Sequence, residues 1–245
     1  MVHRTSLFAC ALIAVLLPLG AAAQLQKDTI STTAGKVEIT FVGHATLALR
    51  WGEKTVLVDP WTKLAGFSEL PKADLILVTH HHGDHFDTAA IAALRSPSTV
   101  ILLTAICAPH VPGSTVMKNG DVKKVLGLTV EAVPAYNLVH MRPDGIPFHP
   151  KGEGNGYVVT IGLTRIYIAG DTEGTPEMKA LRNIDVAFLP MNLPYTMTPE
   201  MVAEAAKAFR PKILYPYHYS QTDTAKVAPL FKDAKGIELR IRNMK

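Results

Sequence analysis

The sequence predicts an α/β fold in which two β-sheets pack face to face with helices outside, a four-layer αβ/βα sandwich. Short β-type runs followed by a helical run occur in the first half of the chain and again in the second. The run at residues 74–79 is almost wholly apolar, as expected for a strand covered on both faces. With 245 residues, of which 48% are hydrophobic, the chain can bury one good core. We expect a single domain over residues 24–245.

Residues 1–23 have the pattern of a signal peptide. Arg4 gives a positive start, residues 7–19 form an apolar run, and the three alanines at 21–23 form a small-residue cleavage site. The apolar run is shorter than the ~20 residues that a membrane span needs. We therefore expect an exported protein, periplasmic or secreted, with no stable membrane anchor after cleavage.

Cleavage would remove Cys10 and leave Cys107 as the one cysteine of the mature chain. A single cysteine in an oxidising compartment cannot form an internal disulfide. Because Cys107 ends an apolar stretch, it is predicted to be a buried small hydrophobe and not a nucleophile.

The first half of the mature chain predicts four strands and one helix. β-branched and apolar runs predict strands at residues 37–42, 46–51, 54–58 and 74–79. A Gly-His turn at 43–44 separates the first two strands, and Asp-Pro at 59–60 stops the third. Asp87 is placed to cap a helix over residues 89–94, which a Ser-Pro pair ends.

The second half repeats this style. Strands are expected at residues 128–133, 156–161, 165–169, 186–189 and 213–215. Residues 199–209 predict a helix with Thr198 as N-cap and proline at its first position, and a last helix is expected over residues 225–232. The glycine-rich residues 152–156 predict a flexible loop.

The charge balance of 25 Lys and Arg against 21 Asp and Glu gives only +4, with no block of five like charges. A nucleic-acid partner is therefore not expected, and the partner is predicted to be a small-molecule substrate. No Gly-x-Ser-x-Gly, Gly-x-Gly-x-x-Gly or P-loop pattern occurs.

The run His80-His81-His82-Gly83-Asp84-His85 follows the apolar strand directly. An extended or turning loop can aim His80 and His82 at one metal ion. Gly83 is expected to permit a sharp turn, after which Asp84 and His85 face a second ion. Imidazole and carboxylate ligands together suit Zn²⁺. His81 is expected to point away.

These residues resemble the metallo-β-lactamase superfamily, whose signature is His-x-His-x-Asp-His. His80, His82, Asp84 and His85 match it residue for residue, and further blocks at 56–60, 168–172 and 215–219 extend the resemblance over nearly the whole mature chain. The wording of the blocks is similar to the branch of metal-dependent hydrolases that includes the L-ascorbate-6-phosphate lactonase relatives. The resemblance implies the metallo-β-lactamase fold and a metal-dependent hydrolase.

The resemblance also implies a set of metal ligands. His80 and His82 would bind the first ion with a further histidine, and Asp84, His85 and His218 would bind the second. Asp171 would bridge the ions, and Asp84 would also receive or shuttle the proton. The residues agree with this, since Asp171 and His218 each follow a short apolar strand.

One ligand of the first ion is open. Where family members usually place a histidine, this chain has Asn137, a poor zinc ligand. His140 and His149 both follow within reach, and we favour His149 because Phe-His-Pro-Lys-Gly at 148–152 resembles a block of this branch. His44 and Asp59 are predicted to contact substrate or to orient a ligand.

The sequence thus predicts a hydrolase that uses metal-activated water on an ester, lactone, amide or phosphoester, with two Zn²⁺ expected and Mn²⁺ or Fe as alternatives. A nuclease-like phosphodiesterase is one competing hypothesis. A non-hydrolytic iron or redox protein, or a metal-binding protein on the same fold, is another. The substrate and the oligomeric state are not specified.

Overall fold

The structure is a computed structural model that describes Met1 and residues 25–244. The predicted signal peptide at residues 1–23 lies, apart from Met1, outside the described residues. None of the helices among the described residues has the length and apolar character needed to span a membrane.

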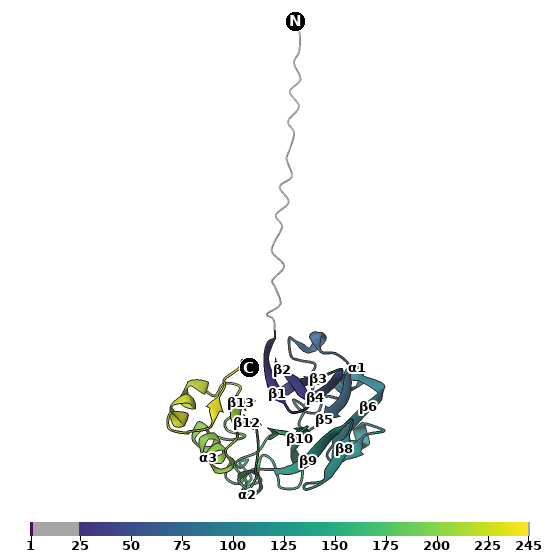
Figure 1. Cartoon of the computed structure of the whole chain (residues 1–245). Helices are drawn as coiled ribbons and strands as arrows, with labels where there is room; N and C mark the ends of the chain where they lie inside the picture. Colours follow the sequence, from purple (N-terminus) through teal and green to yellow (C-terminus); the bar gives the residue numbers. More distant parts are fainter. Residues whose placement is uncertain (2–24, 245) are drawn as a thin grey trace.

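Among the described residues, two seven-stranded sheets make up the fold (Figure 1). The strands of the first sheet stand in chain order, antiparallel from β1 to β4 and parallel from β4 to β7. They are β1 (Gln26–Thr32), β2 (Gly35–Gly43), β3 (Thr46–Trp51), β4 (Lys54–Val58), β5 (Ala73–Leu77), β6 (Arg95–Leu103) and β7 (Thr115–Val116).

The second sheet has the reverse order, β14 to β8, and is parallel from β11 to β14 and antiparallel from β8 to β11. Its strands are β8 (Val122–Val125), β9 (Leu128–Ala135), β10 (Gly154–Ile161), β11 (Thr164–Ile168), β12 (Val186–Pro190), β13 (Ile213–Tyr217) and β14 (Glu238–Leu239).

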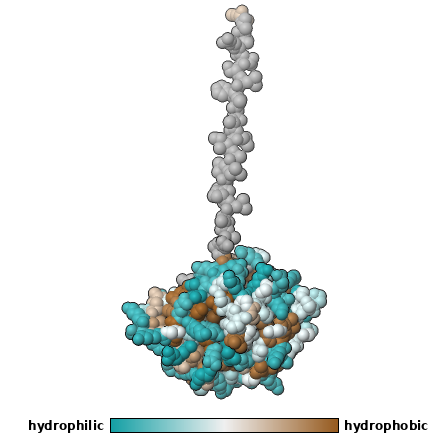
Figure 2. Space-filling view, in the orientation of Figure 1, coloured by the Kyte–Doolittle hydropathy of each residue, from teal (hydrophilic) through white to brown (hydrophobic). Residues whose placement is uncertain are grey.

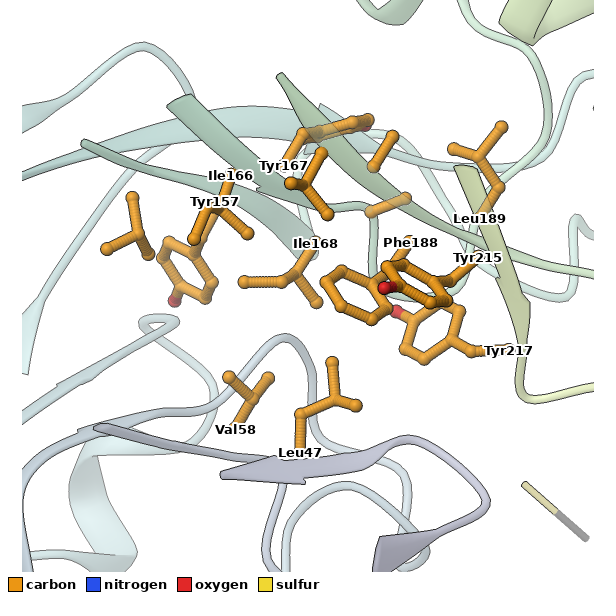
Figure 3. Close-up of a cluster of buried hydrophobic side chains, with 14 of the residues drawn as sticks. Leu47, Val58, Tyr157, Ile166, Tyr167, Ile168, Phe188, Leu189, Tyr215 and Tyr217 are labelled. Atoms are coloured by element: carbon orange, nitrogen blue, oxygen red, sulfur yellow. The ribbon is translucent and has the colours of Figure 1, made fainter. Parts of the chain in front are cut away.

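The main core lies between the two sheets (Figure 3). Leu47 and Val58 of the first sheet face Ile168 and Phe188 of the second, and all four are fully buried. On the inner face of β12 and β13 the rings of Phe188 and Tyr215 stack with centroids 5.0 Å apart. Burial of this apolar surface is the main force that holds the sheets together.

Helices cover the outer faces of both sheets, as the sandwich requires. Ile91 of α1 (Thr88–Leu94) joins an apolar cluster on the outside of the first sheet. On the second sheet, Phe209 of α3 (Pro199–Phe209) packs edge-on against Tyr167. The predicted αβ/βα sandwich is confirmed. Short helices complete the fold: η1 (Phe67–Glu69), η2 (Ala108–His110) and α2 (Pro176–Lys179).

The predicted helix caps are confirmed. The Asp87 carboxylate accepts hydrogen bonds from the backbone of Ala89 and Ala90, and the Thr198 hydroxyl accepts one from Met201. Each cap satisfies donors that the first turn of a helix leaves free. Cys107 is buried as predicted, and burial raises the pKa of its thiol.

Two expectations about the elements are wrong. The last helix is two 3₁₀ turns, η3 (Thr224–Lys226) and η4 (Ala228–Phe231), because Pro229 has no N–H and its ring clashes with a preceding carbonyl in an α-helix. Residues 152–156 are not all loop, since Gly154 begins β10 and is buried.

The outer surface is mostly hydrophilic with small apolar areas on the face drawn in Figure 2.

Candidate metal centre

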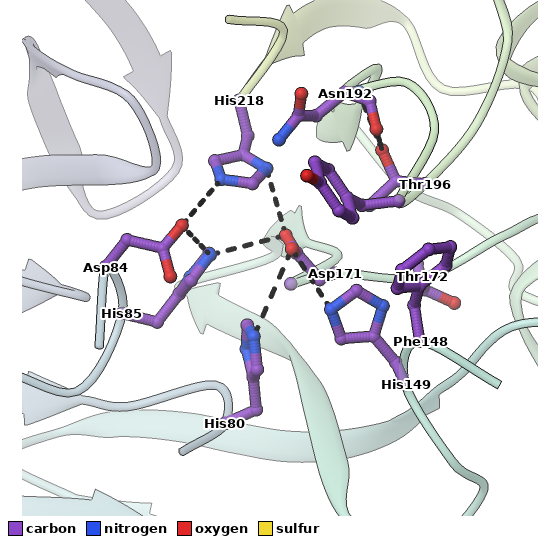
Figure 4. Close-up of polar contacts among 12 residues, drawn as sticks. His80, Asp84, His85, Phe148, His149, Asp171, Thr172, Asn192, Thr196 and His218 are labelled. Carbon is purple, nitrogen blue, oxygen red and sulfur yellow. Dashed lines mark hydrogen bonds and ion pairs between the residues drawn. The ribbon is translucent and has the colours of Figure 1, made fainter. Parts of the chain in front are cut away.

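The predicted metal ligands meet at one edge of the two sheets. Strands β4 and β5 run parallel, as do β11, β12 and β13, so the carboxyl ends of each set lie together. In α/β proteins ligands bind outside such ends. Figure 4 shows the cluster formed there by His80, Asp84, His85, His149, Asp171 and His218.

Three imidazoles form the first group of candidate ligands. Nitrogens of His80, His82 and His149 all lie within 4.8 Å of one another. His80 and His82 stand just after β5, whereas His149 comes from the long loop between β9 and β10. His80 and His149 are buried and His82 is half-buried. This donor set suits one ion.

The second group contains Asp84, His85 and His218, with His44 beside them. Asp84 Oδ2 lies 3.8 Å from His85 Nε2 and 3.4 Å from His218 Nε2. His44 Nε2 lies 2.8 Å from Asp84 Oδ2 and 2.7 Å from His218 Nε2. His44, expected to orient a ligand or contact substrate, therefore touches two members of this group.

The carboxylate of Asp171 lies between the two groups and faces each with a different oxygen. Its Oδ2 is 3.3 Å from His149 Nε2 and 4.0 Å from His80 Nε2. Its Oδ1 is 3.4 Å from His85 Nε2 and 3.1 Å from His218 Nδ1. A carboxylate in this position is able to bridge two ions.

Polar atoms of this cluster are buried without hydrogen-bond partners, which is rare in folded proteins and costs free energy unless an ion or water satisfies them. They converge from both groups and from the bridge, and they are imidazole nitrogens and a carboxylate oxygen, the donors that a divalent metal takes. The residues therefore fit a metal centre. The unpaired atoms are His80 Nε2, His85 Nε2, His149 Nε2, Asp171 Oδ1 and His218 Nδ1.

Two imidazoles of the first group, His80 and His82, are held in the form that binds metal. Burial holds the pKa of His80 well below its ordinary value, and the nearby His85 adds to this effect. Burial and the neighbouring His149 lower the pKa of His82 to about 4. These imidazoles are therefore neutral at pH 7, with a lone pair free for an ion.

The pKa values of Asp171 and His85, which face each other, are shifted in opposite directions. Burial raises the pKa of the Asp171 carboxyl, but His218 and His85 outweigh it and the pKa lies well below its ordinary value. Burial lowers the pKa of His85, but the carboxylates of Asp171 and Asp59 outweigh it and the pKa lies well above its ordinary value. A positive charge is thus stabilised at this point, where a metal would replace the proton of His85.

Asp59 fixes the orientation of His85. Its Oδ2 accepts a hydrogen bond from His85 Nδ1 at 2.8 Å, which turns Nε2 toward the cluster. The backbone N–H and the hydroxyl of Thr79 also donate to Asp59, at 2.8 and 2.6 Å. The Asp59 side chain is fully buried. Carboxylates in this position orient metal-binding imidazoles and raise their basicity.

Several site residues have a left-handed backbone that non-glycine residues seldom adopt. The φ angles are 52° at His44, 44° at Asp59 and 44° at His218. Such strain is typical of sites where the surrounding structure determines the position of a side chain. Gly170 also has a positive φ, and a Cβ there would lie 2.8 Å from Asn155 O, so only glycine fits before Asp171.

A cavity of about 400 Å³ opens over the cluster. It is large enough for a small molecule. The side chains that line it are His82, Asp84, Arg142, Phe148, His149, Asp171, Asn192, Tyr195 and His218.

Comparison with known proteins gives the family. Residues 38–218 match the beta-lactamase superfamily domain. The chain belongs to the metallo-β-lactamase superfamily. It is 31% identical over 220 residues to the UPF0173 metal-dependent hydrolase of Pelotomaculum thermopropionicum, a match that covers 84% of this chain and 96% of that protein.

Solved structures agree with this superfamily. A proposed metal-dependent hydrolase from Parabacteroides distasonis is 43% identical, with a TM-score of 0.86 over 91% of this chain and all of that one. Igni18, a metallo hydrolase from Ignicoccus hospitalis, shares the fold with a TM-score of 0.69 and 23% identity, over 85% of this chain and 95% of that one. The closer resemblance to L-ascorbate-6-phosphate lactonase relatives stays a prediction.

At the position where the superfamily pattern led us to expect a histidine, Asn137 supports His149 instead. Asn137 Oδ1 accepts hydrogen bonds from the backbone N–H of His149 at 2.9 Å and from its Nδ1 at 2.7 Å. This leaves His149 Nε2 facing the first group. His140 lies outside the cluster, where its Nδ1 donates to Glu173 at 2.6 Å. The structure thus brings His149 into the site and leaves His140 out.

Sequence reasoning missed Glu173. Its fully buried carboxylate accepts hydrogen bonds from the backbone N–H groups of Leu138, Val139 and His140, at 2.7–2.8 Å, and from Asn137 Nδ2 at 3.1 Å. Glu173 therefore fixes the loop that carries Asn137. Its closeness to Asp171 in the chain was the one available signal.

Two further features near the site can be placed in the structure. Tyr217 and Tyr219 are buried in the core, and the Tyr217 hydroxyl accepts the N–H of Gly170 at 2.9 Å. The predicted turn at Gly83 is confirmed, since the His85 N–H donates to His82 O at 2.9 Å, but Gly83 has no positive φ and an added Cβ would meet nothing within 4 Å. The left-handed backbone conformations of the site lie instead at His44, Asp59 and His218.

Proposed function

We propose that this metal-dependent hydrolase holds two metal ions between its sheets and uses them to hydrolyse an ester, lactone, amide or phosphoester. The observation that carries the proposal is the position of Asp171, whose two oxygens face separate groups of imidazoles. The names of the relatives support hydrolysis as the reaction class.

Each of the two groups would hold one ion. His80, His82 and His149 would hold the first ion, and Asp84, His85 and His218 the second, with Asp171 between them. When bound, a pair of divalent ions lowers the pKa of water toward ~7 and polarises a carbonyl or phosphoryl oxygen. The protein's part is to hold the donors in fixed positions at the floor of a cavity.

Asp84 is the more accessible of the two carboxylates, and on this ground it is the one proposed to shuttle a proton. Its side chain is 34% exposed, whereas that of Asp171 is 4% exposed. Burial raises the pKa of Asp84, but hydrogen bonds from His218 and His44 outweigh it, so the pKa lies far below its ordinary value. Asp84 is therefore a carboxylate at pH 7, and His44 holds its Oδ2 from the side of the second group.

Zinc fits the donors best, since imidazole with carboxylate is a common zinc set. Manganese and iron take the same donors, and iron would favour the redox alternative. We also propose a small-molecule substrate and action after export, which the cavity and the pattern of residues 1–23 support. N-terminal sequencing of the secreted protein tests export, and retention of Met1 would contradict it.

Metal analysis tests the proposal directly. The mature protein, purified without chelator, is expected to carry about two zinc ions per chain, and Asp171→Asn is expected to carry fewer. His110→Ala, at an exposed end of η2, is the matched control and keeps both. Metal-loaded protein is then screened on lactones, esters, amides, phosphomonoesters and phosphodiesters, with chelation and re-addition of zinc.

The outcomes separate the hypotheses. Hydrolysis that chelation abolishes and zinc restores supports a hydrolase, and turnover confined to phosphodiesters would select the nuclease-like alternative. Iron in the purified protein, with no hydrolysis in any form, would select a redox protein. A protein that takes up no metal even from excess Zn²⁺ would refute the mechanism.

A further inference from the structure

Arg142 is a cation at the cavity that the proposed chemistry does not use. It is the one Lys or Arg among the residues that line the cavity. Residues 141–147 form a small hairpin, in which the Arg142 N–H donates to Ile146 O at 2.8 Å and Met141 pairs with Pro147. The hairpin projects from the loop that also carries His149.

The guanidinium of Arg142 keeps most of its donors free. Its Nη2 donates to the backbone oxygen of Phe148 at 3.2 Å, and within residues 25–244 it has no carboxylate partner. By contrast, Arg165 and Arg242 are each paired with a carboxylate. A guanidinium that is anchored at one nitrogen and unpaired at the others is suited to bind an oxyanion through two hydrogen bonds.

Part of the cavity wall is apolar. The rings of Phe148 and Tyr195 meet edge to face with centroids 5.0 Å apart. Large apolar side chains are also exposed on the two loops that border the cavity, which follow β9 and β12. These side chains are Leu138, Val139, Met141, Ile146, Leu193 and Tyr195.

With two divalent ions bound, the floor of the cavity would add to the positive potential. Asp84 and Asp171 are the carboxylates among its lining residues, and two divalent ions would exceed their negative charge. A site of one sign of charge raises the local concentration of ligands of the other sign.

We infer that the substrate of this hydrolase carries an oxyanion, a carboxylate or a phosphate, that Arg142 binds, next to an apolar group that lies on Phe148 and Tyr195. This inference rests on the proposed function, because the bound molecule is a substrate only if the protein hydrolyses it. Arg142 is then a residue that determines specificity and takes no part in bond cleavage.

Two matched esters test Arg142 on the zinc-loaded mature protein. 4-Nitrophenyl butyrate is neutral, and mono-4-nitrophenyl glutarate adds a carboxylate to the same acyl chain. We expect the ratio of kcat/KM for the glutarate ester to that for the butyrate ester to fall about tenfold to hundredfold in Arg142→Met, mainly through KM of the anionic ester. Arg182→Met is the control: it removes an exposed arginine that does not line the cavity, and it should keep the ratio. An unchanged ratio in Arg142→Met would overturn the inference.

A binding measurement keeps the inference apart from the proposed function. Calorimetry of phenylphosphonate, phenylacetate and neutral phenylacetamide needs no turnover. We expect Arg142→Met to weaken one or both anions at least tenfold and phenylacetamide less, and the anion more affected identifies phosphate or carboxylate. Equal losses for all three ligands, or none, would refute Arg142 as the anion site even if esters are hydrolysed. If no ester is hydrolysed but the anions depend on Arg142, the proposed reaction fails and the binding site stands.

Tyr195→Ser tests the apolar part. The backbone oxygen of Tyr195, which accepts a hydrogen bond from Asn137, is kept in this variant. We expect weaker binding of phenylphosphonate and unchanged binding of methylphosphonate, because only the first has a ring to place on the wall. Equal effects on both ligands would contradict the apolar contact.

Discussion

At the scale of single residues, the pair of Asn137 and His149 shows how the first group of ligands is completed. Asn137 is too weak a zinc ligand to bind by itself, but its Oδ1 accepts two hydrogen bonds from His149. The amide thus holds the imidazole in the orientation and tautomer that leaves Nε2 for the ion. The candidate ligand His149 lies 12 residues after Asn137, and Asn137 supports it by hydrogen bonds.

This assignment predicts different results for two histidines of the same loop. His149→Ala should lose the ion of the first group, because it removes one of three imidazoles. His140→Ala should keep the metal content of the wild type, because His140 faces Glu173. Mass spectrometry of the metal in both purified variants checks this. Full metal content in His149→Ala would mean that a different residue binds.

Glu173 should act on the same ion without touching it. Glu173→Gln puts an NH₂ group among backbone donors, so the loop at residues 137–140 should loosen and zinc affinity of the first group should fall about tenfold to hundredfold. Competition with a chromogenic chelator measures the affinity. Glu204→Gln is the matched control, since Glu204 lies exposed on α3 and pairs with Lys179. Equal affinities in the two variants would remove Glu173 from the support of the site.

How much of the site was predictable differs from residue to residue. The motif at residues 80–85 predicted several ligands because a short loop after a buried strand must present its side chains together. Asp59 was found as an orienting residue because it ends a strand beside that motif. Glu173 was missed because its five donors come from a loop far away in the sequence, and Arg142 because nothing local distinguishes it from a solvated arginine.

At the scale of elements, two glycines near the site should differ in how strongly alanine destabilises the fold. A Cβ at Gly156 in β10 would lie 2.7 Å from Ala169 O and 3.0 Å from the Tyr167 ring, so the backbone must shift. We expect Gly156→Ala to lower the free energy of unfolding by about 1–3 kcal/mol, as for other overpacked sites. Gly83→Ala has open space and should change it by less than about 0.5 kcal/mol. Urea unfolding of both variants measures the difference, and a neutral Gly156→Ala would show that the strands can separate there.

The elements that sequence patterns predicted are those with one clear apolar period or run. The helix at residues 199–209 has a cap, a first proline and an apolar face, and the structure gives the same bounds. The strand β1 was missed because its sequence is polar and only Ile30 is buried. The prediction of an α-helix over residues 225–232 was wrong because Pro229 prevents an α-helix despite the helical composition around it. Composition predicts what is buried, whereas an edge strand depends on its partner.

At the scale of the whole molecule, a polar cluster joins the two ends of the described chain. Asp28 of β1, in the first sheet, accepts hydrogen bonds from Arg242 at 3.0 and 2.7 Å and from the hydroxyl of Tyr215 in the second sheet. Arg240 adds a contact at 3.4 Å. Figure 1 shows β1 beside the C-terminal end. The Asp28 cluster therefore joins the two sheets near their edge strands, β1 and β14.

The Asp28 cluster makes stability depend on pH in a defined direction. Burial raises the pKa of Asp28, but hydrogen bonds from Arg242 and Tyr215 outweigh it, so the pKa in the folded protein lies below the ordinary value. A carboxyl with a lowered pKa stabilises the fold above its unfolded pKa of about 3.9, and this contribution is lost as the pH falls through the folded value.

Asp28→Asn should therefore destabilise the protein by about 1.5–3 kcal/mol near pH 7, the worth of a hydrogen bond to a charged group, or roughly 3–12 °C in Tm for a chain of this size. The difference between wild type and variant should shrink as the pH is lowered below about 4, because protonated Asp28 then resembles the amide. Urea unfolding at several pH values measures it, and Glu38→Gln, which removes an exposed carboxylate that pairs with Lys27, is the control. A difference that stays constant with pH would mean that Asp28 acts by shape, and that the charge does not join the two sheets.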